Sequence, residues 1–209
     1  MARNVQWFDL DTTAAAGALR ERRQRLGKVI AGMTMSLDGF VADPDGNVDR
    51  LYSDLESLQG TPYMNDTVDE TGAVIMGRKT FEMGDPDSYV GTYEFQVAIF
   101  VLTQHPPRTP PKQDDRLTFT FVRDGVASAV AQATAAAGEK AVQVVGGASV
   151  VQQLLQAGLV DELHVDVMPV LLGAGLRLFD QADLKRVGLE TLGVETVGQR
   201  TSLRFRVAR

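Results

Sequence analysis

Two glycine-containing turns hold the residues best suited to chemistry in this chain. One lies in the segment AVIMGRKTFE (residues 73–82) and the other in VQVVGGASVVQQLL (residues 142–155). In each segment, an apolar run rich in β-branched residues predicts a buried strand, and a helix is predicted to begin just after the glycine. The start of a helix presents unpaired N–H groups and the positive end of its dipole, which attract phosphate. We therefore interpret both turns as phosphate-binding sites.

The side chains at these turns predict a ligand larger than a single phosphate. At the first turn, Arg78 and Lys79 are cations that can hold an extra phosphate, and the Thr80 hydroxyl can donate to a phosphate oxygen. The second turn lacks a cation and offers backbone N–H groups with the Ser149 hydroxyl. Together the turns predict a pocket for a phosphorylated dinucleotide, although GGAS is not the Rossmann motif G-x-G-x-x-G. For either turn alone, the alternative is an ordinary strand end without a ligand.

The composition narrows the class of protein. A chain of 209 residues with 44% hydrophobic and 23% charged residues fits one globular domain with a sizeable core. The net charge of −6 argues against nucleic acid or an anionic membrane as a main partner. The absence of cysteine excludes disulfides, thiolate catalysis and zinc–thiolate sites, and no metal site is predicted. Without a long apolar segment or a signal peptide, the expected location is the cytoplasm.

The chain divides into two expected regions. Residues 1–27 are interpreted as an N-terminal extension, expected to be helical, and residues 28–209 as one domain. In the domain, predicted strands alternate with predicted helices, which favours a mostly parallel sheet covered on both faces. Asp124 is predicted to cap an alanine-rich helix. The last two predicted strands are joined at Gly198 as an antiparallel hairpin.

Four motifs resemble, in order, the dihydrofolate reductase-like superfamily. They are MSLDGFVADPDG (residues 35–46), the two segments around the glycine turns, and DELHVDVMPVLLGAGLRLF (residues 161–179). Within this superfamily the chain is similar, from about Lys28 onward, to the RibD C-terminal domain, the reductase half of the riboflavin-biosynthesis deaminase-reductase. The resemblance implies an α/β fold in three layers, α/β/α, with a mixed and mostly parallel sheet. It also implies that NADPH lies across the carboxyl ends of the strands.

The resemblance further implies which residues contact NADPH. The residues at the first turn would hold the adenosine phosphates, those ending the third strand the adenosine ribose or its 2′-phosphate, and those at the second turn the pyrophosphate. A methionine would lie beside the nicotinamide. The residues at the first turn are Gly77, Arg78, Lys79 and Thr80, and those ending the third strand are Thr103 and Gln104. The residues at the second turn are Gly146, Gly147, Ala148, Ser149 and Val150, and the methionine is Met35.

The substrate side rests on fewer residues. Hydride leaves the nicotinamide for the carbon of a C=N or C=O group, and the neighbouring atom gains a proton. Asp38 is predicted to be this acid and a substrate ligand, the alternative being a structural Asp-Gly turn. Asp49 and Asp54, in the segment expected to line the substrate side, are weaker candidates than Asp38 because charged helical residues are usually solvated. Of these two, Asp49 is predicted to bind substrate. Val145 stands where the pyrimidine reductases of the family tend to carry an acidic residue facing the substrate.

These observations predict a stand-alone NADPH-dependent reductase of a small heterocyclic or carbonyl substrate. Its nominal relative is the 5-amino-6-(5-phosphoribosylamino)uracil reductase of riboflavin biosynthesis, but Val145 predicts that this pyrimidine is a poor substrate. The deaminase activity is excluded because its zinc site needs cysteine. The alternatives are dihydrofolate reduction and a non-catalytic NADP-binding module. A homodimer is expected, because the C-terminal hairpin would leave an apolar edge exposed.

Overall fold

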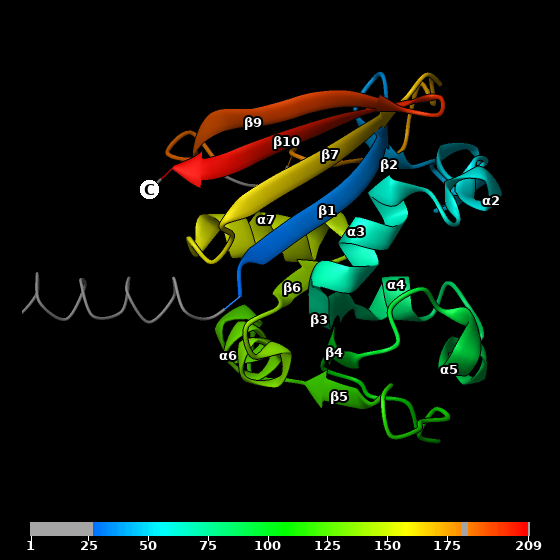
Figure 1. Cartoon of the computed structure of the whole chain (residues 1–209), viewed down its shortest axis with the longest axis vertical. Helices are drawn as coiled ribbons and strands as arrows, with labels where there is room; N and C mark the ends of the chain where they lie inside the picture. The colour runs from blue at the N-terminus through cyan, green and yellow to red at the C-terminus, as the bar shows by residue number, and fades with distance from the viewer. Residues whose placement is uncertain (1–26, 181–183, 209) are drawn as a thin grey trace, which may run out of the picture.

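The computed structural model describes residues 27–180 and 184–208, so the predicted N-terminal helix lies outside the described residues. Within these ranges, eight strands form one sheet in the order β5-β4-β3-β6-β1-β7-β10-β9 (Figure 1). The first six strands in this order, from β5 through to β7, run parallel to one another. Strand β10 is antiparallel to β7, and β9 is antiparallel to β10. The strands are β1 (Val29–Ser36), β3 (Thr71–Gly77), β4 (Ala98–Leu102), β5 (Phe119–Val122), β6 (Ala141–Val144), β7 (Glu162–Met168), β9 (Gly188–Val197) and β10 (Arg200–Ala208).

Helices cover this sheet on both faces, as predicted. Figure 1 shows α3 in front of the sheet and α7 behind it, and each contacts the central strand β3. The described helices are α2 (Leu55–Leu58), α3 (Pro62–Glu70), α4 (Arg78–Phe81), α5 (Tyr89–Thr92), α6 (Val126–Ala137) and α7 (Ala148–Gln156), with 3-10 turns η1 (Asp49–Leu51) and η2 (Pro86–Ser88). The mixed, mostly parallel sheet and the three-layer α/β arrangement are therefore confirmed.

The core forms because the central strands are apolar on both faces. Strand β3 is buried almost throughout, and β6 is buried at every position. Behind them, α7 buries an apolar stripe that includes Val151, Leu154 and Leu155, and α6 contributes small residues that let it lie close to the sheet. Parallel strands covered on both faces need such continuous apolar runs, which is why these elements were visible in the sequence.

Two short strands were not predicted. Strands β2 (Phe40–Ala42) and β8 (Leu176–Arg177) pair antiparallel in a separate small sheet. The Arg177 guanidinium lies 4.3 Å from the centre of the Phe40 ring. Strands of two and three residues are too short for an alternating pattern to stand out.

The predicted cap of α6 was wrong. Gly125, not Asp124, precedes the first helical residue, and no side chain caps this helix. Gly125 has a φ of 98°, which glycine adopts readily and an aspartate does not. The chain therefore enters the helix through glycine backbone geometry rather than through a carboxylate cap.

The C-terminal hairpin was predicted correctly. Strands β9 and β10 pair antiparallel and turn at Gly198, whose φ is 59°. Strand β9 lies at the edge of the sheet and leaves Leu189, Leu192 and Val194 exposed. None of the helices in the described part of the chain combines the length and apolarity required to cross a lipid bilayer.

Candidate active site

The two glycine turns lie side by side at the carboxyl end of the parallel strands, because β3 and β6 are neighbours in the sheet. The Gly77 N–H donates to the Gly146 carbonyl over 2.8 Å, joining one turn to the other. A Cβ atom on Gly77 would lie 3.1 Å from Val150 Cγ2 and 3.5 Å from the Gly147 nitrogen. Gly146 has a φ of 125°, a conformation that side chains disfavour. Glycine is therefore required at both turns for this close approach.

A cavity of about 1180 Å³, here called the glycine-turn cavity, opens at this edge. Ten of the twelve residues predicted to contact NADPH line it, namely Arg78, Lys79, Thr80, Thr103, Gln104, Gly146, Gly147, Ala148, Ser149 and Val150. Within the described residues, the backbone N–H groups of Ala148 and Ser149 at the start of α7 donate to no acceptor. These donors are suited to an anionic group.

The cations at the cavity are accessible. Lys79 is exposed, and Arg78 pairs with Glu82 over 3.1 Å on the same short helix. Both partners of this pair are nearly half exposed, and such pairs contribute little to stability. Arg78 can therefore turn from Glu82 to a ligand at small cost.

Two of the predicted contacts differ in detail. Gly77 does not line the cavity, and it acts instead by letting the two turns meet. Met35 lies beside Val167 of β7 and lines neither large cavity, whereas Met33 lines both. The Met33 sulfur would lie 3.5 Å from a Cβ atom on Gly146. Strand β1 extends beyond the end of β6, so Met33 lies next to the glycine turn and Met35 lies further along β1.

A second cavity of about 850 Å³ adjoins the first, and we call it the aromatic cavity after Tyr52, Tyr63, Tyr89, Tyr93 and Phe95 in its wall. Asp49 and Val145, both predicted on the substrate side, also line it. The two cavities share six lining residues, which are Met33, Val48, Tyr52, Thr80, Met83 and Val145. A ligand reaching the end of one cavity would therefore meet a ligand in the other across this shared wall.

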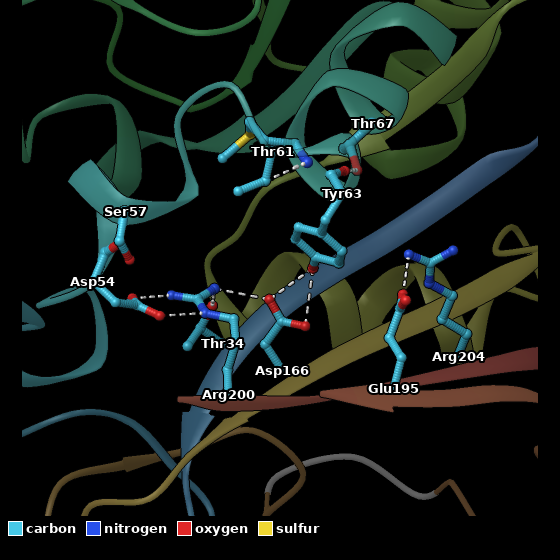
Figure 2. A network of polar contacts seen from close by, with 11 residues as sticks. Thr34, Asp54, Ser57, Thr61, Tyr63, Thr67, Asp166, Glu195, Arg200 and Arg204 are labelled. Carbon is cyan, nitrogen blue, oxygen red and sulfur yellow. Dashed lines mark hydrogen bonds and ion pairs between the residues drawn. The ribbon is translucent and has the colours of Figure 1, made fainter. Parts of the chain in front are cut away.

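A buried ionic network lies beside the aromatic cavity (Figure 2). Arg200, only 3% exposed, binds Asp54 with Nε at 2.9 Å and Asp166 with Nη1 at 2.8 Å. The Tyr63 hydroxyl donates to the same Asp166 carboxylate over 2.8 Å. Burial alone would lower the pKa of Arg200, but its hydrogen bonds to the two carboxylates raise that pKa above its usual value. Asp54 is thus buried and paired, contrary to our expectation that it is solvated.

Asp38 does not have the surroundings predicted for a catalytic acid. It lines neither cavity, and its carboxylate accepts the N–H groups of Leu172, over 3.1 Å, and Gly173, over 2.7 Å. Hydrogen bonds from Ser36 and from these backbone groups lower the pKa of Asp38 to about 2. It therefore has no proton to donate near neutral pH. Gly39, with a φ of 87°, completes the structural Asp-Gly turn that was the alternative.

Comparison with known proteins settles the family. The sequence profile of the RibD C-terminal domain matches residues 27–203. The chain belongs to this family. Among its relatives, the uncharacterized protein YwjB of Bacillus subtilis is 28% identical over 178 residues, which are 85% of this chain and 97% of that protein.

Solved structures share the fold of this RibD C-terminal domain at low sequence identity. The diaminohydroxyphosphoribosylaminopyrimidine deaminase/5-amino-6-(5-phosphoribosylamino)uracil reductase of Thermotoga maritima matches with a TM-score of 0.69 and 14% identity, over 91% of this chain and 59% of that one. Dihydrofolate reductase of Enterococcus faecalis, solved with NADP(H), matches with a TM-score of 0.59 and 17% identity, over 88% of this chain and 98% of that one. Family and fold together support a reductase-like role.

The RibD C-terminal domain described here also contains site residues that sequence reasoning missed. Tyr52 lines both cavities, and burial raises the pKa of its hydroxyl. Gln143 lines the aromatic cavity from β6, two positions before Val145. The alternation of side chains along a strand could have indicated Gln143, because it lies on the same face as Val145. No local pattern marked Tyr52, which lies in an irregular segment just after η1.

Proposed function

We propose that the protein is a stand-alone NADPH-dependent reductase that transfers hydride to a small heterocyclic or carbonyl substrate. The observation that carries this proposal is the junction of the two cavities at Met33, Thr80 and Val145. A dinucleotide lying in the glycine-turn cavity would bring its nicotinamide to that shared wall. A flat substrate in the aromatic cavity would then lie against the nicotinamide ring. Oxidation of NADPH, followed by absorbance, with a panel of cyclic imines and carbonyl compounds tests the proposal.

The residues of the glycine-turn cavity fit such a cofactor. Unpaired N–H groups begin α7, two cations lie on α4, and glycine at both turns keeps side chains away from the ligand. When bound, the cofactor would supply the hydride. The chain's own part would be to hold the pyrophosphate at Gly147 and Ser149, and an additional phosphate at Arg78 or Lys79.

On the substrate side, Tyr52 takes the place that we had assigned to Asp38. When hydride reaches the carbon of a C=N or C=O group, negative charge develops on the neighbouring heteroatom. Of the residues in the shared wall, Tyr52 and Thr80 carry hydroxyl groups. Burial keeps the pKa of Tyr52 above its usual value, so its hydroxyl stays protonated at neutral pH. It can therefore donate a hydrogen bond to that heteroatom, and solvent can supply the proton.

A non-catalytic NADP-binding module is the second candidate. It is favoured by one observation, which is that the six residues shared by the two cavities include no carboxylic acid. Such a module would bind NADPH normally and oxidise it with none of the substrates tested. Steady turnover with any of them would decide for the reductase.

Replacement of Arg78 by alanine is expected to weaken NADPH binding about tenfold or more, because charge-assisted contacts of this kind contribute about 1.5–3 kcal/mol. NADH lacks the additional phosphate, so its affinity should change little. Titration calorimetry with both cofactors measures the difference. Arg116→Ala, at an exposed position outside both cavities, is the matched control. Equal affinities of the wild type for NADPH and NADH would contradict the assignment.

We also propose that the protein is a homodimer that pairs through β9. This edge strand exposes three large apolar side chains, and exposed apolar edges favour association. Light scattering at micromolar concentration should give twice the mass of the chain. Val194→Lys, which places a charge on that face, should shift the mass toward the monomer. A monomeric mass for the wild type would exclude this interface.

A further inference from the structure

Gln143 has a buried side-chain oxygen without a partner. It lies on β6 with 6% of its surface exposed, and its side-chain oxygen accepts no hydrogen bond. A buried carboxamide normally finds partners, because leaving it unpaired costs stability. Gln152 of α7, also 6% exposed, follows this rule and donates to the Leu178 carbonyl over 2.6 Å. Among the described residues, Gln143 is one of three with such an atom, the others being Ser202 and Arg204, and it is the one carboxamide among them.

A glycine in the neighbouring strand leaves room for the Gln143 side chain. Gly32 of β1 lies next to Gln143, and a Cβ atom on Gly32 would be only 2.5 Å from the Gln143 Nε2 atom. Both residues line the aromatic cavity. Gln143 is two positions before Val145, which directly follows β6 at the wall where hydride transfer is proposed, and both Gln143 and Val145 line the aromatic cavity. A ring seated in the aromatic cavity would reach both.

The charges of the aromatic cavity are unfavourable to an anionic ligand. Acidic side chains in its wall include Asp49, Asp66, Glu70 and Glu94. The arginines that line it are already paired, Arg200 with two buried carboxylates and Arg204 with Glu195 over 2.6 Å. His164, also in the wall, contacts Glu162 over 3.2 Å. Arg204 could turn from Glu195, because this pair is 37% and 47% exposed and the Arg204 Nε atom has no partner. Among the described lining residues, however, this one available arginine stands against four acidic side chains, so the balance of charge disfavours an anionic ligand.

Resting on the proposed reductase function, we propose that Gln143 is a specificity-determining residue that binds the substrate ring. The substrate is an uncharged or cationic heterocycle with a lactam edge, an N–H next to a C=O, and carries no phosphate or carboxylate. A carboxamide has one acceptor and two donors, so it can pair with both groups of such an edge. The acidic wall repels anionic tails. This substrate class excludes the phosphorylated pyrimidine of the nominal relative.

Two ligand pairs test the class. They are dihydropterin with dihydrofolate, and uridine with uridine monophosphate. The members of each pair share one lactam ring, and the second member adds an anionic group, which in dihydrofolate is attached through a p-aminobenzoyl arm. Calorimetry on the full chain without cofactor should find the uncharged member of a pair bound about tenfold more tightly, with the difference shrinking as salt is added. Gln143→Leu should weaken that binding about tenfold and leave NADPH affinity unchanged. Equal binding within both pairs, no binding by either pair, or no effect of Gln143→Leu on the ligand would overturn the proposal.

Thermal unfolding gives a second readout that a structural role of Gln143 would not produce. Because the buried amide oxygen is unpaired, Gln143→Leu should raise Tm by about 2–4 °C. The matched variant Gln152→Leu, which removes a paired amide, should lower Tm. A decrease in both would show that Gln143 is a structural residue. NADPH binding is measured separately. A protein that does not bind NADPH would refute the proposed function, but it would leave the test of Gln143 with the lactam ligands undecided.

Discussion

Replacing Arg200 with alanine is expected to lower the free energy of unfolding by about 3–5 kcal/mol. The guanidinium pairs with Asp54 and Asp166, and the first of these pairs is almost fully buried. Without it, two carboxylates would remain close together with no cation to offset their charge. Tyr63 would stay hydrogen-bonded to Asp166 but cannot supply a charge. Urea unfolding of the wild type and the variant measures the loss.

Two further variants show whether the loss comes from burial. Arg206 makes a similar pair with Glu190, but both side chains are 61% exposed. Arg206→Ala should therefore change the free energy of unfolding by less than about 1 kcal/mol. Replacing all three charged residues of the network together, with Asp54→Asn, Asp166→Asn and Arg200→Met, should recover much of the stability lost in Arg200→Ala, because no uncompensated charge remains. If Arg200→Ala and Arg206→Ala lose the same small amount, the network is not a stabilising element.

The sequence predicted those parts of the site that are formed by residues close together in the chain. Strand β3 and strand β6 are short apolar runs followed by glycine, and each turn displays its own N–H groups and side chains. Ten of the twelve predicted cofactor contacts consequently line one cavity. The resemblance gives a motif but not how far β1 runs past β6. This register places Met33, rather than Met35, in the cavity wall beside the turn.

The parts that the sequence could not predict depend on distant contacts. Asp54 and Arg200 are 146 positions apart, so the ion pair that buries Asp54 has no local signal. Asp38 was selected because an aspartate at a strand end suits an acid. Its carboxylate is instead taken up by the loop at Leu172 and Gly173, more than 130 positions away. This is why we propose a hydroxyl group, that of Tyr52, in the role first predicted for a carboxylate.

Replacing Tyr52 with phenylalanine is accordingly expected to lower kcat by about 10²- to 10³-fold, the usual effect of removing one donor to a developing negative charge. The change removes a single oxygen from a residue that lines both cavities, so KM and the affinity for NADPH should change far less. Because burial raises the pKa of Tyr52, the hydroxyl does not titrate near neutral pH, and the decrease should be uniform from about pH 6 to pH 9.

Tyr63→Phe provides the matched comparison for Tyr52→Phe. It removes the same atom from a tyrosine that lines only the aromatic cavity and donates to Asp166. Loss of this donor to a buried carboxylate should lower stability by about 1–3 kcal/mol, while kcat falls less than about tenfold. Steady-state kinetics of both variants on one substrate, with urea unfolding beside them, separate the two roles. A Tyr52→Phe enzyme that retains its kcat, or that loses activity only through KM, would show that Tyr52 shapes the cavity and that the heteroatom takes its hydrogen bond and proton from water.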